Sequence, residues 1–174
     1  MDNRPFAYAM IKPQGMQIRE QIINKLHSVG DVVHASRTFV DRNIMAAHYA
    51  SKSDKPYYKS IVDYMSGKQV ERLIIQGDGS PAELITSLRQ LAGYLKPLQA
   101  EDGTIRRMAI ENKMPHIMVV PQEDRNLQQF AYDNLIHTSD SFAAAIDEIR
   151  LWFPDQPEVV EAAYRSYLSN DFES

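Results

Sequence analysis

The sequence has no cysteine, no long apolar run and no excess of positive charge. The lack of cysteine excludes disulfides, thiolate metal sites and a cysteine nucleophile, so covalent chemistry would fall on serine, threonine, histidine, lysine or a carboxylate. No apolar stretch approaches the roughly 18 residues that a membrane span requires, so no membrane partner is expected. The net charge of -4 argues against a nucleic-acid partner held by broad phosphate neutralisation, but it allows a local basic pocket.

What is present fits a globular protein with a substantial core. The chain has 174 residues, of which 44% are hydrophobic, and a domain typically has roughly 100–200 residues. The opening residues MDNRPFAYAMIK lack the basic stretch and apolar segment of a signal peptide, so we expect a cytoplasmic protein.

Hydrophobic periodicity predicts alternating strands and helices. Apolar runs bounded by turn residues predict strands over residues 6–12, 31–40, 70–76 and 133–137. Apolar residues at helical spacing predict helices over residues 16–29, 43–49, 56–65, 80–92 and 141–153, and a further one after Pro154. Gly30 and Gly93 stand where helix C-caps are expected. Residues 94–130 lose the periodicity and are expected to form an extended loop with an insertion.

This order of elements predicts an α+β fold. It matches the ferredoxin-like βαββαβ template, in which helices cover an antiparallel four-stranded sheet. Many unrelated functions use this template, so the function must be argued from individual residues.

Three cations are candidates for anion recognition. Lys12 closes an apolar strand, where a hydrated charge is costly unless it meets an anion or solvent. Arg89 lies on an otherwise apolar helix face and Arg106 follows a Gly-Thr-Ile run, and guanidinium groups match phosphate oxygens. Surface solvation explains each one alone. Together with His137 they suggest a phosphate pocket, although spacing in sequence does not show that they converge.

The histidines do not form a metal motif. His137 ends a short apolar stretch before residues that cap the next helix, and the simpler interpretation is a histidine that packs beside the cap. The other histidines are His27, His34, His48 and His116. No pair has the spacing of a zinc motif, so a metal site built on histidines is not expected.

The segment GDGSPA at residues 77–82 superficially resembles a dinucleotide-binding fingerprint, because it follows a predicted strand and opens a helix. Ser80 as N-cap and Pro81 in the first turn explain the same residues without a ligand. No acidic residue ends a second strand about 20 residues later, so the structural interpretation is favoured.

Four motifs occur in an order that resembles the nucleoside diphosphate kinase family. They are AMIKPQG at residues 9–15, DGTIR at 102–106, NLIHTSDS at 134–141 and IRLWF at 149–153. His48-Tyr49 and the segment KPYY at residues 55–58 also resemble the family's segment before its nucleotide-binding helical hairpin. The resemblance spans residues 6–153, and the block NLIHTSDS is its most specific part.

The resemblance implies transfer of the terminal phosphate of a nucleoside triphosphate to a nucleoside diphosphate, in ping-pong order and with Mg²⁺. His137 would be the nucleophile that forms a phosphohistidine. Glu148 would fix the tautomer of His137 with support from Ser139, and Tyr49 would lie beside the imidazole.

The resemblance also assigns the nucleotide contacts. Phosphates would be bound by Lys12, Arg89 and Arg106. Lys12 would also assist catalysis. Asn134 would hold the ribose or a phosphate, and Tyr57 would stack on the base. No protein side chain is expected to ligate the metal, because the nucleotide phosphates would hold most of the Mg²⁺.

The chain departs from the family pattern at three residues and in the greater length of the segment between Arg106 and Asn134. Leu95 replaces a threonine that contacts phosphate, which removes a hydrogen bond worth about 0.5–1.5 kcal/mol. Thr138 stands where glycine or alanine is commoner, and Arg107 replaces a glycine. The resemblance therefore implies one kinase-like domain over residues 1–153, with an insertion at residues 107–130 and a helical tail over residues 154–174.

Two other functions compete with an active, base-unspecific kinase. A catalytically weak family member acting as a nucleotide-binding or regulatory protein is motivated by Leu95 and the insertion. An RNA-binding ferredoxin-like module is disfavoured by the net charge and by the absence of aromatic-rich strand motifs. Family members are homo-oligomers, and Pro97 matches a loop involved in assembly, so we expect a homo-oligomer.

Overall fold

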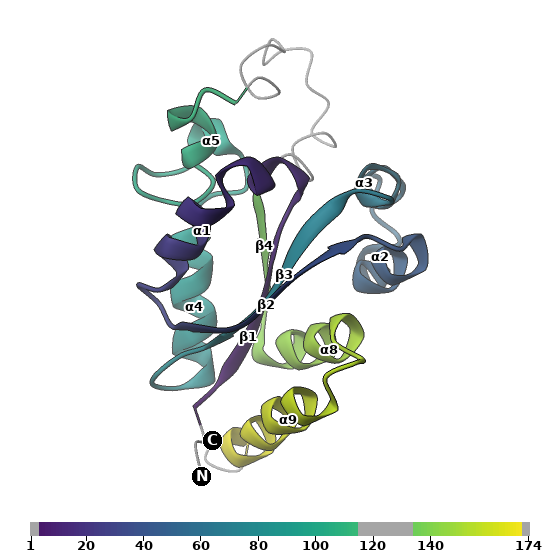
Figure 1. Ribbon diagram of the computed structural model, residues 1–174, viewed down its shortest axis with the longest axis vertical. Helices are drawn as coiled ribbons and strands as arrows, with labels where there is room; N and C mark the ends of the chain where they lie inside the picture. The colour runs from purple at the N-terminus through teal and green to yellow at the C-terminus, as the bar shows by residue number, and fades with distance from the viewer. Residues whose placement is uncertain (1–3, 115–133, 172–174) are drawn as a thin grey trace.

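The computed structural model describes residues 4–114 and 134–171. In this part of the chain one antiparallel sheet has the strand order β2-β3-β1-β4 (Figure 1). The strands are β1 (Phe6–Ile11), β2 (Asp31–Phe39), β3 (Gln69–Gln76) and β4 (Ile136–Thr138). Strand order and element order confirm the predicted α+β, ferredoxin-like fold.

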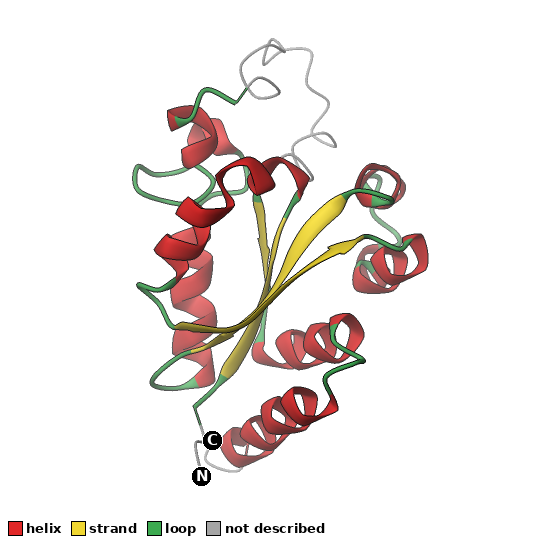
Figure 2. Cartoon of the chain, viewed as in Figure 1, coloured by secondary structure: helices red, strands yellow, loops and turns green. Residues whose placement is uncertain are grey.

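Helices cover both faces of the sheet (Figure 2). One face carries α1 (Arg19–Leu26), α4 (Pro81–Ala92) and the short α5 (Met108–Glu111). The other face carries α2 (Arg42–His48), α3 (Tyr58–Met65), α8 (Phe142–Trp152) and α9 (Pro157–Asp171). Short 3-10 segments η1 (Pro13–Ile18), η2 (Ala50–Lys52) and η3 (Pro97–Gln99) join these elements.

Strand β1 is central because its side chains are apolar on both faces. Ala7, Ala9 and Ile11 belong to the core under α1 and α4, whereas Tyr8 and Met10 belong to the core under α2, α3 and α8. All six residues of β1 are buried. Lys12 therefore directly follows a fully buried inner strand of the sheet.

Helix α4 has the boundaries that its sequence predicts. Ser80 and Glu83 form a capping box at its start, as expected for this pairing. Gly93 ends it with a φ of 83°, a conformation that favours glycine. A Cβ on Gly93 would also lie 2.4 Å from the Thr104 hydroxyl oxygen.

Several predicted boundaries were wrong. The helix predicted over residues 16–29 begins as η1, and α1 ends at Leu26 with His27 as its C-cap. Gly30 is therefore not the cap. A Cβ there would lie 2.6 Å from the Gln76 carbonyl oxygen, so close packing on β3 requires the glycine. Helix α3 begins at Tyr58, two residues later than predicted.

The described part of the predicted loop at residues 94–130 contains the short helices η3 and α5, so its prediction as extended was wrong there. Backbone hydrogen bonds from Ile105 to Leu91 and from Arg106 to Ala92 hold it against the end of α4. The rest of the predicted insertion, with His116, lies outside the described residues. Nowhere in residues 4–114 and 134–171 does a helix have the length and apolar character needed to span a membrane.

Candidate active site

A cavity of about 600 Å³ opens beside the ends of β1 and β4. Seven of the predicted site residues line it: Lys12, Tyr49, Tyr57, Arg89, Arg106, Asn134 and His137. The fold thus brings together residues that come from both halves of the chain. Ser139 and Glu148 are not among the lining residues, but Glu148 contacts His137 and Ser139 contacts Glu148.

Strand β4 places His137 on the floor of the cavity, opposite Met10 of β1. A tight turn precedes the strand. Leu135 has a φ of 67°, and the Ile136 amide donates to the Asn134 carbonyl oxygen at 2.8 Å. The Lys12 amide donates to the Leu135 carbonyl oxygen at 2.8 Å. A three-residue turn with a positive φ at its central residue is rare and strained, and strained residues of this kind cluster at functional sites.

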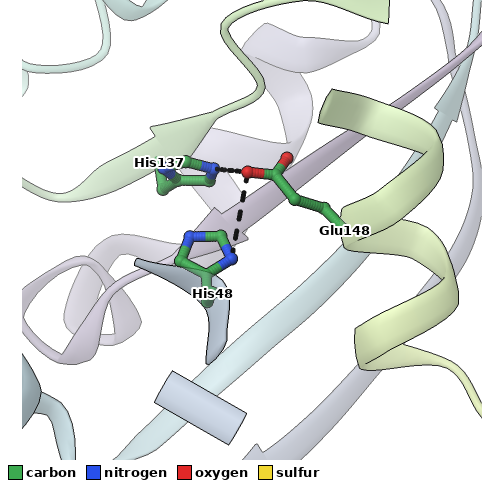
Figure 3. Close-up of side chains that lie close together, drawn as sticks. All are labelled: His48, His137 and Glu148. Atoms are coloured by element: carbon green, nitrogen blue, oxygen red, sulfur yellow. Dashed lines mark hydrogen bonds and ion pairs between the residues drawn. The ribbon is translucent and has the colours of Figure 1, made fainter. Parts of the chain in front are cut away.

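Glu148 on α8 sets the orientation of the His137 ring. The Nε2 atom of His137 lies 2.8 Å from Oε1 of Glu148, and the Ser139 hydroxyl donates to the other carboxylate oxygen. A carboxylate only accepts hydrogen bonds, so the ring proton lies on Nε2. Nδ1 then carries the free lone pair, and it lies on the side of the ring away from Glu148 (Figure 3).

Lys12 and Asn134 form a buried polar pair at the cavity. The Nζ atom of Lys12 donates to Oδ1 of Asn134 at 2.9 Å, and Lys12 is only 3% exposed. The Asn134 amide in turn lies 3.4 Å from the Leu95 carbonyl oxygen. The lysine charge is thus held in low-dielectric surroundings, where it attracts an anion strongly.

Arg106 is the most deeply placed guanidinium of the cavity. It donates to the carbonyl oxygens of Gly93 at 2.7 Å and Ile136 at 3.2 Å, whereas its buried Nε has no hydrogen-bond partner among the described residues. Burial lowers the pKa of Arg106 to about 10. The group therefore stays charged at neutral pH, and an anion would relieve the cost of burying it.

Asp140 links two further cations of the cavity, Arg89 and Lys52. Its carboxylate lies 3.3 Å from Arg89 Nη1 and 3.0 Å from Lys52 Nζ. Burial acts to raise the pKa of Asp140, but the hydrogen bond and charge of Lys52 and the charge of Arg89 outweigh it and hold the pKa below its ordinary value. Ser141, not Asp140, caps α8 by accepting from the Ala144 amide.

Two tyrosines of the predicted site, Tyr49 and Tyr57, also line the cavity. The Tyr49 ring lies beside the imidazole, with its centroid 6.2 Å from that of His137. Burial and the nearby Glu148 charge raise the pKa of Tyr49, so its hydroxyl remains a donor. Tyr57 lines the cavity at the start of α3.

Sequence reasoning gave no role to His48, Trp152, Lys52 or Asp140. Ligand atoms of His48, His137 and Glu148 lie within 4.8 Å of one another, close enough to consider a metal site. Hydrogen bonds engage these atoms instead, because Glu148 accepts from His137 and His48 Nδ1 accepts from the Trp152 indole at 3.1 Å. Motif spacing could not reveal this cluster, since its members come from α2, β4 and α8.

Comparisons with known sequences find one family over most of the chain. The family model described as nucleoside diphosphate kinase matches residues 6–157. Nucleoside diphosphate kinase 1 of Glycine max is 31% identical over 97% of this chain and 99% of its own length. The nucleoside diphosphate kinase of Microcystis aeruginosa is 32% identical over 85% of this chain and 87% of its own.

Solved structures give the same result. A nucleoside diphosphate kinase family protein from Babesia bovis matches with a TM-score of 0.66 and 27% identity, over 87% of this chain and 90% of its own. The enzyme from Halobacterium salinarum, solved in complex with CDP, matches with a TM-score of 0.63 and 25% identity, over 86% and 88%. By the extent of these matches, the chain belongs to the nucleoside diphosphate kinase family.

Proposed function

We propose that this protein is a nucleoside diphosphate kinase that transfers the γ-phosphate of a nucleoside triphosphate to a nucleoside diphosphate through a phosphohistidine at Nδ1 of His137. One observation carries this proposal. The hydrogen bond between His137 Nε2 and Glu148 leaves the Nδ1 lone pair as the free nucleophile beside a cavity whose lining includes Lys12, Arg89 and Arg106. Lys52 and Lys96 also line this cavity.

The chemistry proceeds in two half-reactions. Nδ1 of His137 forms a bond to the γ-phosphorus while the bond from that phosphorus to the bridging oxygen breaks, and the diphosphate leaves. A second diphosphate then enters, its terminal oxygen attacks the phosphorus, and the nitrogen–phosphorus bond breaks. The phosphorylated ring carries positive charge, which the adjacent Glu148 carboxylate stabilises.

The remaining side chains bind and orient the nucleotide. Lys12, Arg89 and Arg106 neutralise phosphate oxygens, and Asn134 holds the ribose or a phosphate. Arg89 pairs with Asp140 in the free protein, and nucleotide phosphates compete with Asp140 for it. Tyr57 stacks on the base, and because every base has an aromatic face, this contact tolerates different bases.

The cavity offers few side-chain ligands for a metal ion, which fits Mg²⁺ held mainly by the nucleotide. Among the described residues that line it, Asp140 is the only carboxylate, and it is already paired with Lys52 and Arg89. Mg²⁺ is commonly bound through one or two carboxylates plus substrate phosphates. When bound, the metal neutralises charge on those phosphates.

Labelling with γ-labelled ATP tests the proposal. Wild-type protein should form an acid-labile, base-stable phosphoprotein that a nucleoside diphosphate removes as the triphosphate. His137→Ala should abolish the label, while His27→Ala, which changes an exposed histidine at the end of α1, should keep it. Labelling of His137→Ala at the wild-type rate would contradict the mechanism.

Leu95 favours the second candidate function, a catalytically weak nucleotide-binding or regulatory protein. Its apolar side chain is 46% exposed at the cavity rim and offers no hydrogen bond to a phosphate. If wild-type protein binds nucleotide but does not label, this function replaces the first. Homo-oligomeric assembly, the cytoplasmic location and the division into residues 1–153 and 154–174 stay predictions.

A further inference from the structure

His48 is a buried imidazole next to the nucleophile that the proposed mechanism does not use. Its side chain is 0% exposed, and its ring centroid lies 4.4 Å from that of His137 at an interplanar angle of 75°. His48 Nδ1 lies 3.8 Å from Oε1 of Glu148, the same oxygen that accepts from His137 at 2.8 Å (Figure 3). Two imidazoles therefore approach one carboxylate oxygen.

The tautomer of His48 decides whether these imidazoles compete. With its proton on Nδ1, His48 would need only a small ring rotation to donate to Glu148. That bond would give the ring N–H of His48 an acceptor. A proton on Nε2 has none, because Nε2 is buried and has no hydrogen-bond partner in the described part of the chain. A buried donor without a partner is costly, so His48 would gain by moving its proton to Nδ1. Glu148 therefore accepts from His137 alone only if another contact keeps the His48 proton on Nε2.

Trp152 supplies that restraint. Its indole Nε1 lies 3.1 Å from His48 Nδ1, and an indole nitrogen can only donate. Nδ1 of His48 must accept, so its proton lies on Nε2. Burial, and then the charges of His137, Lys12 and Lys52, lower the pKa of His48 well below its ordinary value. The doubly protonated ring, which would also have a proton on Nδ1, is therefore disfavoured.

The indole donor is itself held in place. Trp152 is 2% exposed, and its ring is stacked on Tyr8 with centroids 6.1 Å apart and 16° between planes. The Arg72 guanidinium on β3 donates to the Trp152 carbonyl oxygen. These contacts fix the end of α8 against the sheet and so fix the direction of the N–H group.

We propose that Trp152 is a positioning residue which, through the tautomer of His48, keeps Glu148 available to His137 alone. The proposal rests on the proposed function, since it concerns the orientation of the nucleophile. It assigns a role in the reaction to an indole that neither touches the nucleotide cavity nor contacts His137 through a hydrogen bond.

The test uses ¹⁵N-histidine NMR and γ-labelled ATP on the full chain. In wild-type protein, the ring ¹⁵N shifts should show His48 and His137 each with a protonated Nε2 and an unprotonated Nδ1. Trp152→Phe keeps an aromatic ring but removes the donor. In this variant the His48 proton should move to Nδ1, and phosphorylation of His137 should slow about tenfold, the size expected from weakening one hydrogen bond to a charged group. The affinity for ADP should not change.

His48→Phe is the matched background. A phenylalanine cannot compete for Glu148, so Trp152→Phe should have little further effect on labelling in His48→Phe protein, as a double-mutant cycle measures. A tenfold loss in both backgrounds, an unchanged rate in Trp152→Phe, or an unprotonated His48 Nδ1 in Trp152→Phe would overturn the proposal.

Two remaining outcomes also decide it. If Trp152→Phe does not fold, the wild-type spectrum alone is the test, and a protonated Nδ1 on His48 would overturn the proposal. If wild-type protein does not label, the proposed function fails, while the tautomers in wild type and Trp152→Phe still show whether the indole controls His48.

Discussion

Nζ of Lys12 lies 2.9 Å from Oδ1 of Asn134, so the end of β1 and the turn before β4 meet at the floor of the cavity. This contact holds a buried cation where the proposed phosphates bind. Lys12→Met keeps the apolar stem but removes the charge. Because a hydrogen bond between charged groups contributes about 1.5–3 kcal/mol, the dissociation constant for ATP should rise roughly 10- to 100-fold.

Calorimetric titration with ATP measures this change. Lys59→Met is the control, because Lys59 is 83% exposed and pairs only with Asp63 on its own helix α3 among the contacts described. Equal affinities of Lys12→Met and wild-type protein would remove Lys12 from the phosphate site.

Glu148→Gln should slow phosphorylation of His137 without weakening nucleotide binding. The amide keeps the shape of the side chain but lacks the charge that stabilises the phosphorylated ring. The loss of one charge-assisted hydrogen bond predicts a rate roughly 10- to 100-fold lower. Rapid-quench labelling with γ-labelled ATP gives the rate, and Glu158→Gln on the exposed side of α9 is the control. A weaker affinity with an unchanged rate would show that Glu148 acts in binding instead.

Leu95→Thr should strengthen nucleotide binding. It places a hydroxyl at the cavity rim, where the family usually has threonine, and one added hydrogen bond of about 0.5–1.5 kcal/mol corresponds to a roughly 2- to 10-fold lower dissociation constant. Titration with ADP measures it. An unchanged affinity would mean that another group of this chain already fills that role.

Acid should destabilise the protein through His48. Burial holds its pKa well below the ordinary value, so below pH about 6.5 the unfolded chain binds a proton that the folded chain does not. The stabilising contribution is fully present above that pH and is lost as the pH falls toward the folded-state pKa. His48→Phe should therefore make the free energy of unfolding depend less on pH between about 7 and 5.

Urea unfolding at several pH values tests this dependence. Tyr8, Tyr49, His137, Glu148 and Trp152 surround His48 and are the same in both proteins. Equal slopes in wild type and His48→Phe would show that His48 does not take up the proton. His27→Ala, which changes an exposed histidine, should leave the slope as it is in wild type.

Most of the fold could be predicted from local sequence patterns, because most of its strands and helix ends are determined by residues close together in sequence. The apolar run of β1 and the Ser80–Glu83 capping box are of this kind. Gly30 is not, since the need for glycine comes from the carbonyl oxygen of Gln76 on β3. Helix α5 was missed because backbone hydrogen bonds to the end of α4 hold its segment.

Residues of the site also differ in whether their own sequence segment or a contact with a distant segment reveals them. His137 and Lys12 could be named because they stand out in their own segments and match family motifs. His48 looked like an ordinary histidine at the end of a short helix, and Trp152 like one more apolar residue of α8. Their hydrogen bond joins α2 to α8, and only the folded sheet brings those helices together. Contacts of this kind leave no spacing signal in the sequence.

The most direct test of the account is the position of the phosphate on the imidazole. Protein labelled with ¹⁵N-histidine would be phosphorylated with ATP, denatured in base and analysed by ³¹P and ¹⁵N NMR, with His137→Ala as the control. The hydrogen bond from Nε2 to Glu148 predicts that the phosphate is on Nδ1 of His137. A phosphate on Nε2, or on any other residue, would contradict the account.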